Sequence, residues 1–154
     1  PKHVQQFVKE GHLRWDSLGE YCALVPSFEQ VAITSGNATA TIFAETLDQA
    51  ISTYLENAKS PSRKVNEIDN RGSTFNLAMY WAEALSLQEK DADLKTRFSA
   101  IYKQLDQNSP LIENELLAAQ GNPVDIGGYF LPDVEKTTRA MRPSTTLNSI
   151  LDNI

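Results

Sequence analysis

The side chains best suited to chemistry in this sequence are cations and hydrogen-bonding groups at the predicted breaks between helices. They form two groups, one before residue 17 and one around residues 58–73. The first group contains His3, His12 and Arg14, and the second contains Arg63, Lys64 and Arg71. The guanidinium fork of arginine matches the geometry of a phosphate, and helix N-termini add backbone donors and a favourable dipole. These groups are therefore suited to binding a phosphate.

The same cations also fit a second interpretation, in which they are solvated loop charges paired with nearby carboxylates. Glu20, Glu67 and Asp69 offer those carboxylates. Because the chain has a formal net charge of -6, a phosphate site has to be built locally from clustered cations. The residue types alone favour the second interpretation, and both stay open at this point.

The well-known catalytic motifs are absent from the sequence. It contains no nucleophile elbow, P-loop, zinc-protease or C-x-x-C pattern, and Gly127-Gly128 does not satisfy the dinucleotide-binding pattern. The lone Cys22 lies on an apolar helical face, which favours a small core residue over a nucleophile. His3 and His12 are not spaced as zinc ligands on one helix, and no carboxylate cluster indicates a Mg²⁺ site. The sequence therefore predicts no catalytic or metal-binding residue.

The elements that position these groups are predicted to be helices with marked ends. An S-x-x-E capping box at residues 17–20 begins one helix, Gly36 ends it, and Asn37 caps the next. The later helices are predicted over 38–56, 74–88, from 91 onward, from Ser109-Pro110 to Gly121, 133–141 and 144–152. A loop over 58–64 and a turn-rich stretch over 124–132 connect them. The predicted fold class is mostly α.

Composition limits the class of protein further. The 154 residues are 41% hydrophobic and 22% charged, which is typical of one globular unit spanning 1–154. The negative net charge argues against a nucleic-acid binder, and no apolar run is long enough to span a bilayer. A single cysteine favours a reducing compartment, so we expect a cytoplasmic protein. The chain begins at Pro1 without Met, so we expect a processed protein or a piece of a longer one.

Five blocks of the sequence are longer than generic motifs and follow one another along nearly the whole chain. They are Gly11-His12-Leu13-Arg14-Trp15-Asp16-Ser17-Leu18-Gly19-Glu20, Lys59-Ser60-Pro61-Ser62-Arg63-Lys64-Val65 with Asp69-Asn70-Arg71-Gly72-Ser73, Met79-Tyr80-Trp81-Ala82, Gln120-Gly121-Asn122-Pro123-Val124-Asp125-Ile126-Gly127-Gly128-Tyr129 and Ala140-Met141-Arg142-Pro143-Ser144. In content and order these blocks resemble the C-terminal region of the monomeric, single-chain NADP-dependent isocitrate dehydrogenases.

The resemblance implies that the chain is the multi-helix C-terminal part of an isocitrate/isopropylmalate dehydrogenase-like monomeric enzyme. Enzymes of this family oxidise isocitrate and decarboxylate it to 2-oxoglutarate, using NADP and Mg²⁺ or Mn²⁺. The isocitrate and metal ligands of the family come from earlier parts of the polypeptide, so the fragment alone is expected to be inactive. Its expected partners are the rest of its own polypeptide and, in the full-length enzyme, isocitrate. Neither nucleic acid nor a membrane is expected.

By their places in the matched blocks, the NADP-binding residues of the family fall on Arg14, Asp16 and Arg63, and a short match at the start of the chain adds His3. The three cations can surround the 2′-phosphate that distinguishes NADP from NAD, each charge-assisted bond contributing roughly 1.5–3 kcal/mol. Asp16 would repel a phosphate, so we expect it to accept from the ribose or adenine, or to orient Arg14. Arg71 is a reserve candidate, and a buried structural role is its alternative.

Each of these residues also has a simpler interpretation. His3 is then a frayed terminal residue, Asp16 a helix cap, and Arg63 a loop cation. For the whole chain the competing interpretation is a free-standing helical interaction module without catalysis, with Arg14 and Arg63 scattered over its surface. The enzyme interpretation instead requires the two arginines to converge near Asp16, with His3 close by.

Overall fold

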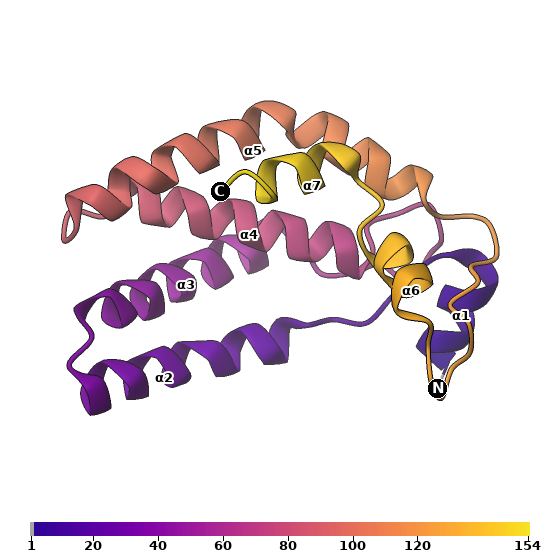
Figure 1. Ribbon diagram of the computed structural model, residues 1–154, viewed down its shortest axis with the longest axis horizontal. Coiled ribbons are helices and arrows are strands. Elements are labelled where there is room, and N and C mark those ends of the chain that lie inside the picture. Colours follow the sequence, from indigo (N-terminus) through magenta and orange to yellow (C-terminus); the bar gives the residue numbers. More distant parts are fainter. Residues whose placement is uncertain (1) are drawn as a thin grey trace. The chain divides into compact units, whose positions relative to one another are not determined.

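The computed structural model describes residues 2–154, and the regular structure in this part of the chain is helical (Figure 1). The helices are α1 (Lys2–Glu10), α2 (Leu18–Ser35), α3 (Ala38–Glu56), α4 (Asn70–Leu87), α5 (Ala92–Ala118), α6 (Val134–Met141) and α7 (Thr145–Leu151). Residues 2–154 contain no strand, so the predicted mostly α fold is confirmed. None of the described helices combines the length and the apolar composition that crossing a bilayer requires.

The chain divides into two compact units at four points, of which two fall within α4 and α5 and two lie outside the helices. Unit 1 comprises the chain up to Asp16, Ser60–Ser73 and Asn108–Ile154, and unit 2 comprises Ser17–Lys59 and Thr74–Gln107. The single helical unit that the sequence predicts over 1–154 stays a prediction. All the candidate binding residues belong to unit 1.

Unit 2 is built around the antiparallel pair α2 and α3, which lie side by side (Figure 1). Gly36 ends α2 in the left-handed conformation, with φ of 62°, as predicted. The Asn37 side chain caps α3 by accepting from the amide of Ala40 at 3.1 Å, also as predicted. The core of this unit is formed by Leu47, Ala50, Ile51, Tyr54 and Leu77. Helix α3 spans residues 38–56, which are the bounds that the sequence predicts.

The predicted capping box of α2 lacks the side-chain cap of Ser17. Ser17 has φ of -84° and ψ of 14°, and its side chain makes no capping hydrogen bond. A capping residue needs an extended backbone to turn its side chain toward the amides of the first turn, and Ser17 lacks it. The expectation that Cys22 is a core residue is also wrong, because Cys22 is exposed. It lies beside the face of α2 on which Tyr21 and Val25 pack against the core of unit 2.

Helix α4 begins at Asn70, one turn before the predicted start at Thr74. The carboxylate of Asp69 explains the difference, because its Oδ1 accepts from the amide of Arg71 at 2.9 Å and from that of Gly72 at 3.4 Å. An aspartate immediately before a helix satisfies first-turn amides in this way. Residues 70–73, which lie before the predicted helix, are therefore the first turn of α4.

The prediction of two helices separated at Ser109-Pro110 is wrong, because α5 runs through Pro110 without a break. A proline inside a helix costs about 3 kcal/mol. Four apolar side chains at helical spacing across the proline are buried, namely Ile101, Leu105, Ile112 and Leu116. Burying each of them contributes roughly 1.5–3 kcal/mol, so together they outweigh the cost of the proline.

Helix α1 was not predicted, whereas α6 and α7 were. Only three of the nine residues of α1 are apolar. The other two helices have clear caps, since Asp133 accepts from the amide of Lys136 and Ser144 from that of Leu147. The predicted ends of these helices are confirmed to within a residue.

Glu115 connects the C-terminal part of α5 to the start of α7, which lies along it (Figure 1). Its carboxylate accepts from the hydroxyl of Ser144. It also accepts from the amide of Thr146 at 3.2 Å and from the hydroxyl of Thr146 at 2.9 Å. These hydrogen bonds, chiefly that from Ser144, lower the pKa of Glu115 below its usual value of 4.5.

Replacing Glu115 with glutamine is expected to lower the thermal midpoint of unfolding at neutral pH but not in acid. The native pKa lies below the unfolded one, so this stabilisation is present above the unfolded pKa and is lost as the pH falls through the native pKa. Midpoints measured by circular dichroism at about pH 7 and about pH 3 test the prediction. Glu29→Gln, at an exposed position of α2, is the control. If the midpoint of Glu115→Gln differed from that of the wild type by the same amount at both pH values, the prediction would be contradicted.

Candidate functional site

Unit 1 brings separate stretches of chain together at the C-terminal end of α1. Gly11 ends this helix with φ of 62°, and its amide donates to the carbonyl of Phe7 at 2.8 Å. A Cβ atom at Gly11 would lie 2.9 Å from the carbonyl oxygen of Ala119, so only glycine allows this close approach. The amide of Gly121 donates to the carbonyl of Glu10 at 2.7 Å. The segment after α5 is thereby fixed against the end of α1.

Arg71 is a buried structural residue. Its Nη2 donates to Asp69 Oδ2 at 2.7 Å and to the Gly11 carbonyl at 2.6 Å, and its Nη1 donates to the Ala140 carbonyl at 2.7 Å. The guanidinium also lies 5.5 Å from the centre of the Phe7 ring. Only 3% of the Arg71 side chain and 1% of the Asp69 side chain are exposed. The guanidinium is thus committed to interior partners, which supports the structural alternative for this reserve candidate.

His12 is also buried and does not lie at the surface of a loop. Its Nδ1 lies 2.7 Å from Gln120 Oε1, and its Nε2 lies 2.8 Å from the carbonyl oxygen of Ser62. Gln120 in turn accepts from the amide of Asn66 at 2.8 Å and donates to the carbonyl of Glu67 at 2.9 Å. His12 and Gln120 therefore hold the loop 60–68 at three of its residues.

The four predicted cofactor residues lie on neighbouring segments of unit 1. His3 is on α1 and half-buried, and its ring centre lies 5.2 Å from that of Trp15. The half-buried Arg14 and the exposed Asp16 flank Trp15 in the chain. Arg63 is exposed in the loop 60–68, and its carbonyl accepts from Gln6 Nε2 of α1 at 3.1 Å. The His3–Trp15 contact thus holds the segment of Arg14 and Asp16 against α1. The bond from Gln6 holds the loop of Arg63 against the same helix.

The guanidinium groups of Arg14 and Arg63 form no ion pair with any carboxylate of residues 2–154. Two of the carboxylates that the loop-charge interpretation offers are paired with cations of the same group, as that interpretation expects. Glu67 Oε1 lies 3.9 Å from Lys64 Nζ, and Asp69 is paired with Arg71 in the interior. The loop-charge interpretation therefore accounts for the ion pair of Lys64, but not for Arg14 and Arg63.

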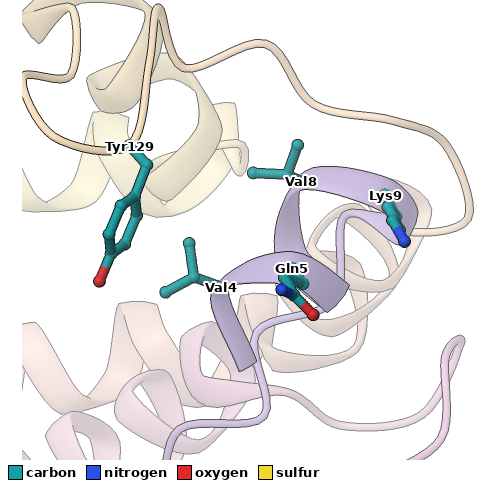
Figure 2. Close-up of a pocket in the computed structure, with 5 residues that line it drawn as sticks. All are labelled: Val4, Gln5, Val8, Lys9 and Tyr129. Atoms are coloured by element: carbon teal, nitrogen blue, oxygen red, sulfur yellow. The ribbon is translucent and has the colours of Figure 1, made fainter. Parts of the chain in front are cut away.

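An apolar pocket of about 340 Å³ lies on another face of α1, lined by Val4, Gln5, Val8, Lys9 and Tyr129 (Figure 2). In the close-up, the side chains of Val4 and Val8 point toward the ring of Tyr129. The lining is mainly apolar, so this pocket does not match a nucleotide phosphate. It suits an apolar side chain instead.

A second hollow in unit 1, of about 400 Å³, includes Arg71, Asp125, Lys136 and Arg139 in its lining. Two of its three cations are already paired. Arg71 bonds to Asp69, and Lys136 Nζ lies 2.6 Å from Asp125 Oδ2. That hydrogen bond lowers the pKa of Asp125 and raises the pKa of Lys136. The hollow is therefore a weaker candidate for an anion than the surface that carries Arg14 and Arg63.

Comparison with known proteins assigns this helical chain to a class of dehydrogenase. The family model described as monomeric isocitrate dehydrogenase matches residues 1–152. The chain is 56% identical over 151 residues to isocitrate dehydrogenase [NADP] 2 of Colwellia maris and 54% identical over 151 residues to isocitrate dehydrogenase [NADP] of Azotobacter vinelandii. It is 52% identical over 154 residues to isocitrate dehydrogenase [NADP] 2 of Mycobacterium tuberculosis. The chain belongs to the monomeric isocitrate dehydrogenase family.

The matches cover nearly all of this chain but a small part of each relative. They span 98%, 98% and 100% of the chain, and 20%, 20% and 21% of the three relatives. The chain thus spans about a fifth of the length of the curated relatives it matches. The assignment of His3, Arg14, Asp16 and Arg63 to the cofactor stays a prediction.

Proposed function

We propose that this chain is the C-terminal part of a longer cytoplasmic polypeptide, an NADP-dependent isocitrate dehydrogenase. The whole enzyme oxidises isocitrate and decarboxylates it to 2-oxoglutarate. The chain contributes the side of the cofactor site that binds the adenine and the 2′-phosphate. Membership of the family, with a match along residues 1–152, is the observation that carries the proposal.

Four residues of unit 1 hold the cofactor in this proposal. Arg14 and Arg63 bind the 2′-phosphate through guanidinium groups that no carboxylate of residues 2–154 occupies. His3 completes the cationic side of the site from α1, held beside Trp15. Asp16 accepts from the ribose or adenine, or orients Arg14. Bound NADP supplies the hydride acceptor, and these residues fix its position relative to the substrate.

The divalent metal of the reaction belongs to other parts of the polypeptide. In residues 2–154, no group of three or more His, Cys, Asp and Glu side chains is arranged to hold a metal ion. These residues therefore do not fit a Mg²⁺ or Mn²⁺ site. The same holds for isocitrate, whose ligands we place in the remaining part of the enzyme. The isolated chain is accordingly expected to have no activity.

The mass of the native polypeptide tests this proposal. An antibody raised against the chain should detect a band several times heavier than 17.1 kDa in the source cells. That polypeptide, once purified, should reduce NADP when isocitrate and Mg²⁺ are supplied. A band near 17.1 kDa would instead support a free-standing helical module.

The loop before α6 should make the isolated chain self-associate. Tyr129, Phe130, Leu131 and Val134 are 61%, 97%, 85% and 79% exposed. Neighbouring exposed apolar side chains of this kind mark a surface that another protein segment covers, which we propose is the rest of the polypeptide. Sedimentation at increasing concentration should show oligomers of the wild-type chain and fewer oligomers of Phe130→Ser with Leu131→Ser. Ser99→Ala, at an exposed site of α5, is the control. Monomers of the wild-type chain at all concentrations would count against the covered surface.

A further inference from the structure

His12 is a buried titratable residue that the proposed function does not use. It is 0% exposed, and each of its ring nitrogens lies within 2.8 Å of an oxygen atom. The neutral ring has one donor nitrogen and one acceptor nitrogen, whereas the imidazolium has two donors. The chemical nature of the two oxygen partners therefore decides which form the site holds.

Both partners of His12 can only accept a hydrogen bond. The oxygen of Ser62 is a backbone carbonyl. The orientation of the Gln120 amide is fixed by two other bonds, because its oxygen accepts from the amide of Asn66 and its nitrogen donates to the carbonyl of Glu67. Gln120 thus turns Oε1 toward His12 Nδ1. With an acceptor at each nitrogen, the arrangement is satisfied when His12 donates from both.

These bonds act on the loop that carries Arg63. His12 binds the carbonyl of Ser62, the residue immediately before Arg63. Gln120 binds Asn66 and Glu67 on the other side of Arg63 in the chain. The backbone on both sides of Arg63 is therefore held by the His12–Gln120 pair, while the Arg63 side chain is exposed.

The geometry points to His12 as a positioning residue that holds the loop of Arg63 in place for the 2′-phosphate. This inference rests on the proposed function. When the side chain of His12 is replaced by one without donors, its bonds to Ser62 and Gln120 are lost. The hold on the loop 60–68 then weakens, and Arg63 binds the phosphate less well.

The test compares variants of the full-length enzyme by steady-state kinetics with isocitrate. His12→Leu removes both donors and should raise the KM for NADP about tenfold, since it removes charge-assisted bonds that position a phosphate ligand. Its kcat should change less than about twofold, because the reacting atoms are elsewhere. His12→Gln keeps an amide donor for the carbonyl of Ser62, so it should keep a KM for NADP near wild type.

A double-variant cycle separates positioning from a general structural effect. In the Arg63→Ala background, His12→Leu should raise the KM for NADP no further, because His12 acts through Arg63. The same increase in both backgrounds would overturn the inference, as would an unchanged KM in His12→Leu. If Arg63→Ala alone leaves NADP binding unchanged, the proposed phosphate site itself is wrong, which is a distinct outcome. If His12→Leu does not fold, the same cycle with Gln120→Leu tests the inference, because Gln120 holds Asn66 and Glu67 on the other side of Arg63.

Discussion

Replacing Arg63 with alanine in the complete enzyme is expected to raise the KM for NADP by roughly 10- to 150-fold, the equivalent of one charge-assisted hydrogen bond. The KM for NAD should change much less. NAD lacks the 2′-phosphate, so it has no group for this guanidinium to bind. The side chain is exposed and forms no ion pair with residues 2–154, so removing it leaves no buried charge behind. The loss should therefore reflect ligand binding alone.

The chain offers a matched control for this experiment. Lys64 follows Arg63 in the same loop and is also exposed, and its Nζ lies 3.9 Å from Oε1 of Glu67. Lys64→Ala removes one positive charge from the same surface without removing a proposed phosphate ligand. Its effect on the KM for NADP should be a few-fold at most, as for screened surface charges. Equal losses for NADP and NAD in Arg63→Ala would refute the 2′-phosphate assignment.

Local signals in the sequence were sufficient to predict most of the helices. Helix α3 was predicted with its observed bounds, because Asn37 caps it and its apolar residues repeat at helical spacing. The helices α6 and α7 followed from Asp133 and Ser144. The signal at Ser109-Pro110 was misleading, because the burial of residues on both sides of the proline depends on tertiary packing that a local rule does not include.

The site was predicted less completely, and distance along the chain explains the difference. The roles of Arg71 and His12 depend on partners far away in the sequence, such as Ala140 and Gln120. No spacing rule connects residues that are 69 or 108 positions apart. Arg14 and Arg63 were identified because their blocks resemble the family. Their freedom from internal carboxylates became visible only in the structure.

Replacing Arg71 with methionine is expected to destabilise the chain by about 3–5 kcal/mol, the usual consequence of removing one partner of a buried ion pair. The variant leaves the carboxylate of Asp69 buried without its cation. It also leaves the carbonyls of Gly11 and Ala140 without their donor. The urea midpoint of unfolding, followed by circular dichroism on the 154-residue chain, measures the effect.

A second substitution distinguishes the buried charge from lost packing. Asp69→Asn in the Arg71→Met background removes the stranded carboxylate, while the asparagine oxygen still accepts from the first-turn amides of α4. The double variant should therefore be more stable than Arg71→Met alone. Lys90→Met is the control, because its ion pair with Glu45 is exposed and should contribute less than about 1 kcal/mol. If Arg71→Met were as mild as Lys90→Met, the buried pair would not hold the end of α1 to the start of α4.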